Sequence, residues 1–136
     1  QGRENSRDYE DISKFSGIDA IICGDVALYK LISISEVVLT VYSTGGIEAI
    51  AAEKPLIIFD PFNTPGSSFY NSRNILFLNN DDDLYSTLDK IMSDHFFLEN
   101  VIRKQNIFLE ENIFKNDGRS AERIYNQIIN MIKNKV

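Results

Sequence analysis

The chain has 136 residues, 43% of them hydrophobic, which is enough to bury one core, so we expect one folded domain. Its formal net charge of −6 and its lack of a clustered Lys/Arg stripe argue against binding to nucleic acid or to an anionic membrane. No apolar run reaches the roughly 18 residues that a membrane-spanning helix needs. The single Cys23 and the single His95 exclude an internal disulfide and a conventional zinc site. We therefore expect a cytoplasmic protein without a metal or a cofactor.

The first part of the chain combines a polar segment with a short apolar run. Residues 1–16 are rich in charge, and we expect this segment to be partly disordered, with a helical turn or two between Tyr9 and Phe15. Ile18 to Cys23 is apolar between two glycines and predicts a strand. Asp25 is a candidate helix N-cap. The helix that it would start carries apolar residues at i, i+3 and i+4, namely Leu28, Leu31 and Ile32.

The segment Glu36 to Asp60 predicts a βαβ unit. Glu36 to Tyr42 is too continuously apolar for a strand with one wet face, so it indicates a parallel sheet covered on both sides. Ser43, Thr44, Gly45 and Gly46 form the turn into a short helix, and Pro55 opens the next apolar strand.

The segment after Asp60 predicts a long polar loop followed by a strand. Phe62 to Ser72 carries the loop residues, and we expect raised mobility there. Asn74 to Leu78 reads as a strand. Asn79 to Asp83 then caps a helix that ends near Asp94. Its apolar face carries Leu84, Leu88 and Ile91.

Helical periodicity continues from His95 to the end of the chain, with a break at Asn116, Asp117 and Gly118. The last helix, Arg119 to Lys133, is expected to bury one apolar face made of Ala121, Ile124, Ile128 and Ile132. The order of elements therefore predicts an α/β fold, a Rossmann-like small parallel sheet flanked by helices, with a C-terminal helical cluster.

The predicted sheet contains four parallel strands, centred on Ile21, Val38, Ile57 and Leu76. In such a sheet ligands bind at the carboxyl ends of the strands, so we expect the site at one edge. The turns at that edge are Cys23 to Asp25, Tyr42 to Gly46, Asp60 to Ser68 and Asn79 to Asp83. Of these, the Ser43–Gly46 turn is the candidate phosphate cradle, because glycines at a helix start let backbone N–H groups approach an anion.

Structural roles also account for these residues. Gly45 and Gly46 would then only shape the turn, and Glu48 would be an N3 residue bonding back to the N-cap. Asp81, Asp82 and Asp83 fit a helix cap better than a metal site, and Cys23 fits a small core residue. Lys54 and Arg73 lie near the sheet edge, where either could help to bind a phosphate, although Lys54 also fits a helix C-terminus.

A hydrolase is the alternative enzyme class. Ser43 on a strand-to-helix turn, followed by Asp60 and His95, has the order of an α/β-hydrolase triad. Val41 argues against it, because the nucleophile turn needs a small residue two positions before the serine. Neither a GxGxxG dinucleotide fingerprint nor a P-loop is present.

The run Val37 to Asp60, with the pattern S-T-x-G-x-E-A followed by K-P and an apolar strand, resembles the C-terminal nucleotide-sugar-binding domain of GT-B-type glycosyltransferases. The non-hydrolysing UDP-N-acetylglucosamine 2-epimerases are similar. The tail, Phe114 followed by DGRSAERI, resembles the end of such domains. Two features differ: Glu53 stands where the family usually has glycine before K-P, and no basic residue lies beside the turn.

The resemblance implies that Ser43, Thr44, Gly45 and Gly46 contact the diphosphate of a donor, with UDP the expected nucleotide, and that Glu48 binds the ribose. Residues 17–136 would then be the donor-binding C-terminal half of a two-domain enzyme of surface-polysaccharide or glycoconjugate synthesis. An N-terminal acceptor domain would be missing, in keeping with a chain that opens at Gln1, and the fragment would be inactive alone. No catalytic residue is assigned. The alternatives are a 2-epimerase-type domain and a non-catalytic nucleotide-binding module.

Overall fold

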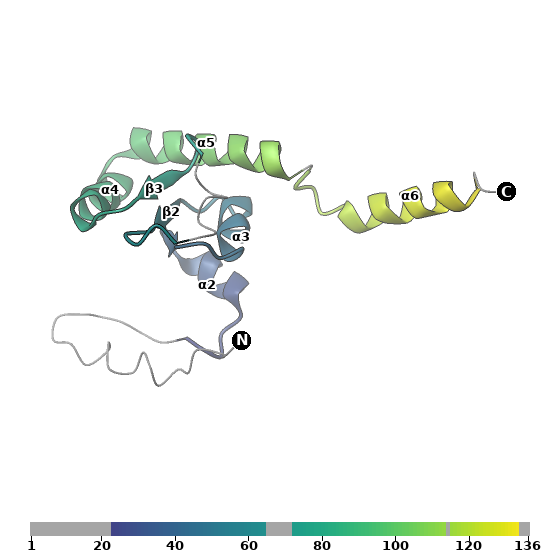
Figure 1. The fold of residues 1–136 in the computed structure, drawn as a ribbon, viewed down its shortest axis with the longest axis horizontal. Coiled ribbons are helices and arrows are strands. Elements are labelled where there is room, and N and C mark those ends of the chain that lie inside the picture. Colours follow the sequence, from purple (N-terminus) through teal and green to yellow (C-terminus); the bar gives the residue numbers. More distant parts are fainter. Residues whose placement is uncertain (1–22, 65–71, 114, 134–136) are drawn as a thin grey trace.

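The computed structural model describes residues 23–64, 72–113 and 115–133. The elements in chain order are α2 (Leu28–Ile34), β1 (Val38–Thr40), α3 (Gly45–Ala51), β2 (Leu56–Phe59), β3 (Leu76–Leu78), α4 (Asp81–Ser93), α5 (His95–Asn112) and α6 (Ser120–Lys133) (Figure 1). The predicted α/β fold with a helical C-terminus is confirmed. The polar segment 1–16, nearly all of the strand predicted at Ile18 to Cys23, and most of the loop predicted at Phe62 to Ser72 lie outside the described residues.

The sheet in the described part of the chain has three parallel strands in the order β1-β2-β3. Val38 pairs with Leu56, and Ile57 pairs with Leu76. Both pairings confirm the parallel arrangement that the apolar runs predicted. The central strand β2 is inaccessible to solvent at Leu56, Ile57 and Ile58, as expected of a strand covered on both faces. The same expectation is wrong for β1, where Leu39 is 47% exposed.

The core lies between the sheet and α5. It contains Ile50 of α3, Leu56 and Ile58 of β2, Ile75, and Phe108 and Leu109 of α5. The apolar positions of α5 recur at helical spacing, and one member of that buried stripe is polar: Gln105 is 1% exposed. Its side-chain Nε2 donates to Leu56 O at 2.8 Å, and Leu56 N donates to its Oε1 at 3.3 Å. Gln105 therefore pairs with the main chain at the start of β2 as a neighbouring strand would.

The C-terminus of α3 ends in a Schellman motif. Glu53 N donates to Ile50 O and Lys54 N donates to Ala49 O, both at 2.9 Å. Glu53 occupies the left-handed position of this motif with φ 57°. Glycine adopts that conformation without steric cost, so a glutamate at this position is strained relative to glycine.

The helix starts agree with the sequence at α4 and differ at α2. Asn80 is the N-cap of α4, and its side chain accepts a hydrogen bond from Asp83 N at 2.9 Å. By contrast, the predicted cap at Asp25 is wrong. Residues 24–26 form a turn, and α2 begins only after Ala27. Ala27 is the N-cap; its backbone is extended, and its side chain makes no cap hydrogen bond.

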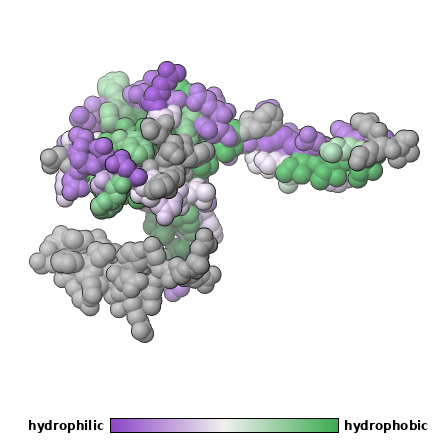
Figure 2. Space-filling view, in the orientation of Figure 1, coloured by the Kyte–Doolittle hydropathy of each residue, from purple (hydrophilic) through white to green (hydrophobic). Residues whose placement is uncertain are grey.

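The prediction that the last helix buries an apolar face is wrong. α6 forms within the predicted range, but none of its residues is buried. It extends away from the sheet and α5, and one of its sides is continuously hydrophobic (Figures 1 and 2). The exposed fractions run from 50% to 63% across Ile124, Tyr125, Ile128, Met131 and Ile132. Fully burying one side chain of this size contributes roughly 1.5–3 kcal/mol. In this structure the face therefore contributes little of the free energy that its burial would provide.

The segment between α5 and α6 is held to the first turn of α6 by Arg123. Its guanidinium donates to both carboxylate oxygens of Asp117, at 2.7 and 2.8 Å, and Arg119 N donates to the same carboxylate at 3.0 Å. These bonds lower the pKa of Asp117 below its ordinary value of 3.8, and the hydrogen bond from the Arg123 side chain has the largest effect. Asn116 also donates to Ala51 O at 3.3 Å, which links this segment to α3.

Candidate functional site

The parallel strands bring three chain segments to one edge of the sheet. We call the edge where the strands end the carboxyl edge and the opposite one the amino edge. Ser43 follows β1, Asp60 follows β2, and Asn79 follows β3, so all three lie at the carboxyl edge. This is the edge at which open α/β sheets bind ligands.

The turn at Ser43 to Gly46 is closed by its own hydrogen bonds. Ser43 N donates to Thr40 Oγ1 at 3.4 Å, and Gly45 N donates to Ser43 Oγ at 3.2 Å. Gly46 N donates to Ser43 O, and Ile47 N to Thr44 O, both at 3.0 Å. The N–H groups of Ser43, Gly45 and Gly46, which we expect to cradle a diphosphate, thus have internal acceptors in this structure. The bond from Gly45 N to the Ser43 hydroxyl, at 3.2 Å, is longer than the bonds from Gly46 N and Ile47 N.

Gly45 also has a packing role. It is buried, and a Cβ atom built on it would lie 2.9 Å from Leu28 Cδ2 of α2. Any side chain there would push Leu28 away, so the absence of a Cβ lets α2 approach the start of α3. The structural interpretation of Gly45 is therefore supported, and it is compatible with a ligand at the same turn.

Glu48 is exposed on the first turn of α3. The N-cap of α3 is Thr44, which makes no side-chain cap bond, so the N3 residue is Ile47. The alternative in which Glu48 is an N3 residue closing a capping box is therefore wrong. Ser43 and Thr44 are exposed as well, which leaves three polar side chains around two buried glycines.

Asp60 is a carboxyl-edge residue whose structural role the sequence did not reveal. It is inaccessible to solvent at the end of β2. Its carboxylate accepts from Phe62 N at 3.3 Å, from Thr64 N at 2.7 Å and from Thr64 Oγ1 at 2.9 Å. The loop also contains Asn63 in the left-handed conformation, with φ 51°. The start of this loop is thus fixed by a buried carboxylate.

Two aromatic side chains at this edge remain in solvent. Tyr42, just before Ser43, is 58% exposed, and Phe62, within the loop fixed by Asp60, is 87% exposed. The pairing of β1 with β2 ends at Thr40 and Ile58, so Tyr42 and Phe62 lie in the segments that follow these two adjacent strands. Asp60, Tyr42 and Phe62 are visible in the sequence, but the burial of Asp60 and the exposure of the two aromatic side chains depend on the loop geometry.

The residues of the hydrolase hypothesis do not meet. Phe97, in the first turn of α5, lines a small cavity with Arg73 to Leu76, where β3 begins, so the start of α5 belongs to the amino edge. His95 begins that helix with its side chain 76% exposed and pairs with Glu99 at 3.2 Å. Ser43 lies at the carboxyl edge, and Asp60 is bonded within its own loop. The triad is therefore not formed.

The two basic candidates also lie away from the turn. Lys54 follows the C-terminus of α3 and precedes β2, and Arg73 precedes β3, so both belong to the amino edge. Neither can neutralise a phosphate at Ser43 to Gly46 in this arrangement. Within the described ranges, no cluster of His, Cys, Asp and Glu side chains is suited to hold a metal ion. None of the helices there is both long enough and apolar enough to cross a membrane.

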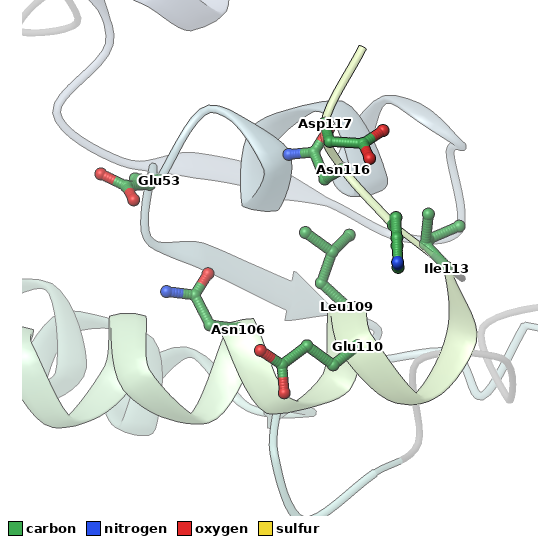
Figure 3. Close-up of a pocket in the computed structure, with 8 residues that line it drawn as sticks. Glu53, Asn106, Leu109, Glu110, Ile113, Asn116 and Asp117 are labelled. Carbon is green, nitrogen blue, oxygen red and sulfur yellow. The ribbon is translucent and has the colours of Figure 1, made fainter. Parts of the chain in front are cut away.

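A cavity of about 560 Å³ opens at the amino edge, between the end of α3, α5 and the segment before α6 (Figure 3). Leu109 points from α5 toward Asn116 and Asp117, and Glu53 lies across from them at the end of α3. None of the predicted site residues lines this cavity. Its walls mix apolar and oppositely charged side chains and show no convergent set of polar groups, so they define no ligand chemistry.

Comparisons of the chain with protein-family models, with curated proteins and with solved structures returned no match.

Proposed function

We propose that this chain is the donor-binding domain of a glycosyltransferase and that it binds a nucleoside-diphosphate sugar at the carboxyl edge of its sheet. The observation that carries the proposal is the β1–α3 turn: the residues of the S-T-x-G-x-E-A pattern lie together at the edge where ligands of open α/β sheets bind. Surface-polysaccharide or glycoconjugate synthesis is the expected setting, and UDP is the expected nucleotide.

Each residue of the turn has a definite role in this proposal. A phosphate oxygen replaces Ser43 Oγ as the acceptor of Gly45 N–H, because the present bond of 3.2 Å is long and the hydroxyl can rotate away. The hydroxyls of Ser43 and Thr44 then donate to the phosphate oxygens. Glu48 accepts hydrogen bonds from the ribose hydroxyls. Such donors stabilise the charge that grows on the leaving diphosphate when the glycosidic bond breaks.

The site has little positive charge, and the chain as a whole carries −6. Long-range electrostatics therefore oppose the approach of a diphosphate. We expect weak binding, in the millimolar range, that strengthens when salt screens the repulsion. This salt dependence is opposite to that of a basic phosphate site and can be measured in the same titrations.

Calorimetric titration with UDP tests the proposal. Glu48→Gln should weaken binding by about 1.5–3 kcal/mol, the usual contribution of a hydrogen bond to a charged group, without changing the fold. The control is Glu36→Gln, which alters another exposed glutamate that precedes β1 at the amino edge. If Glu48 acts only on the dipole of α3, the variant should instead lose roughly 0.3–1 kcal/mol of stability and bind UDP unchanged.

Ser43→Ala gives a second test, because it removes the hydroxyl but keeps the backbone of the turn. We expect UDP affinity to fall by about 0.5–1.5 kcal/mol, the net contribution of one neutral hydrogen bond. Gly45→Ala is unsuitable for this purpose, since its new methyl group would displace Leu28. The absence of saturable binding of UDP, CDP, GDP and ADP by the unaltered chain would refute the proposed function.

A further inference from the structure

Phe62 combines exposure with a fixed position at the carboxyl edge. Its side chain is 87% exposed, although phenylalanine gains free energy when it leaves water. The backbone on both sides of it is bonded to Asp60, through Phe62 N at 3.3 Å and Thr64 N at 2.7 Å. The Asp60 carboxylate is inaccessible to solvent, so these bonds anchor the loop backbone to the end of β2. The backbone conformation that they fix leaves the Phe62 ring in water.

Single exposed hydrophobic residues are common on protein surfaces and need no function. The location of Phe62 is what distinguishes it. β1 and β2 are adjacent parallel strands, so the loop that follows β2 and the Ser43–Gly46 turn that follows β1 leave the sheet at the same edge. Phe62 is therefore anchored in the segment that follows β2, next to the segment after β1 that carries the turn of the candidate site. Phe96 is similarly exposed, at 82%, but belongs to the start of α5 at the amino edge.

We propose that Phe62 is the surface against which a ring attached to the diphosphate of the donor rests. This inference rests on the proposed function, which places the diphosphate at Ser43 to Gly46. A nucleoside-diphosphate sugar carries a ring at each end of the diphosphate, the nucleobase and the sugar, and either presents an apolar face to an aromatic side chain. Phe62 would thus add affinity for a ring where the turn itself recognises only phosphate. Asp60 is the positioning residue, because its carboxylate sets the loop that holds Phe62.

The test compares three ligands: inorganic pyrophosphate, UDP and UDP-glucose. Phe62→Ala should weaken the binding of the ligand whose ring it contacts by roughly 5- to 160-fold, the range for loss of a stacked aromatic side chain. Pyrophosphate binding should not change, because pyrophosphate has no ring. Weakening of UDP and UDP-glucose alike assigns the nucleobase, and weakening of UDP-glucose alone assigns the sugar.

Two further variants separate stacking from a general effect on the fold. Phe62→Trp should keep the affinity because it keeps an aromatic face, and Phe96→Ala should leave all three ligands unaffected. Because Phe62 is exposed, Phe62→Ala should also retain the urea midpoint of the unaltered chain.

If the unaltered chain binds UDP and UDP-glucose and Phe62→Ala binds both equally well, the inference is wrong while the proposed function stands. Equal weakening of pyrophosphate would also overturn it, by showing that the substitution disturbs the turn. If the unaltered chain binds none of the three ligands, the proposed function fails and this inference fails with it.

Discussion

Replacing Gln105 by leucine should strongly destabilise the protein, although the new side chain is apolar and of similar size. Gln105 lies in the buried stripe of α5, where leucine fits the pattern of its neighbours Val101 and Phe108. Leucine, however, can neither donate to Leu56 O nor accept from Leu56 N. Both main-chain groups belong to a residue with no exposed surface, so water cannot replace the lost partner.

The expected loss follows from the two hydrogen bonds. A buried main-chain group that loses its partner costs about 1–3 kcal/mol. The bond to Leu56 O, at 2.8 Å, belongs near the upper end of this range, and the bond from Leu56 N, at 3.3 Å, near the lower end. We therefore expect Gln105→Leu to lower the free energy of unfolding by about 3–4 kcal/mol. Domains of this kind have about 5–15 kcal/mol in total, so the loss should be evident at once.

Urea denaturation, followed by a probe of the core, measures this difference. The matched control is Asn106→Leu, the neighbouring amide on α5, which is only partly buried and has no hydrogen bond to the main chain of β2 in the described part of the chain. It should change stability by no more than about 0.5 kcal/mol. A loss below about 1 kcal/mol for Gln105→Leu would refute the pairing with Leu56.

Gln105→Glu examines the same contact through pH. A protonated carboxyl group can accept from Leu56 N and donate to Leu56 O, whereas a carboxylate faces the carbonyl oxygen with negative charge. Burial disfavours the charged form and raises the pKa of the new carboxyl group. The variant should therefore be closest to the unaltered protein at acidic pH and lose stability as pH rises through that pKa.

Glu53→Gly should raise stability by about 0.5–1 kcal/mol, because relief of a left-handed non-glycine residue, about 1–2 kcal/mol, exceeds the entropy that glycine loses; a lower urea midpoint would contradict this. Asn80→Ala should lower the free energy of unfolding by about 0.5–2 kcal/mol because it removes the acceptor for Asp83 N, whereas Asn80→Ser should retain most of the stability. Equal losses for both variants would show that the cap hydrogen bond does not matter. NMR titration of the Asp117 carboxyl group should give a pKa below 3.8, since Arg123 binds its charged form. The bond between Asp117 and Arg123 should accordingly be complete above that pH and be lost as pH falls through the lowered pKa, and a midpoint at or above 3.8 would be evidence against the bond.

The parts of the fold that could be predicted depend on local sequence. The apolar run Glu36 to Tyr42 and the run after Pro55 predicted two parallel strands, although burial on both faces, argued from the first run, holds only for β2. Asn80 has a side chain that is favoured at an N-cap. Gln105 could not be identified in this way, because its partner Leu56 lies 49 residues away in sequence. A polar residue within the apolar stripe of α5 was the only available signal.

The candidate site shows the same division. The residues Ser43 to Gly46 predicted the turn, and the order of the parallel strands predicted the edge of the sheet at which it lies. The packing of Leu28 against Gly45 and the burial of Asp60 depend on tertiary contacts that residue types do not specify. α6 illustrates the limit most simply: periodicity shows that one face is apolar, but not whether anything covers it.

The isolation of α6 affects how the chain unfolds. With no buried residue, this helix of 14 residues shares little free energy with the core, and a helix of that length is marginal in water by itself. It should melt at a lower temperature than the sheet and α5, so the chain would not unfold in one cooperative step. Far-ultraviolet circular dichroism, which counts every helix, should then change before a probe placed in the core. The calorimetric enthalpy should correspondingly exceed the van't Hoff enthalpy obtained from the main transition.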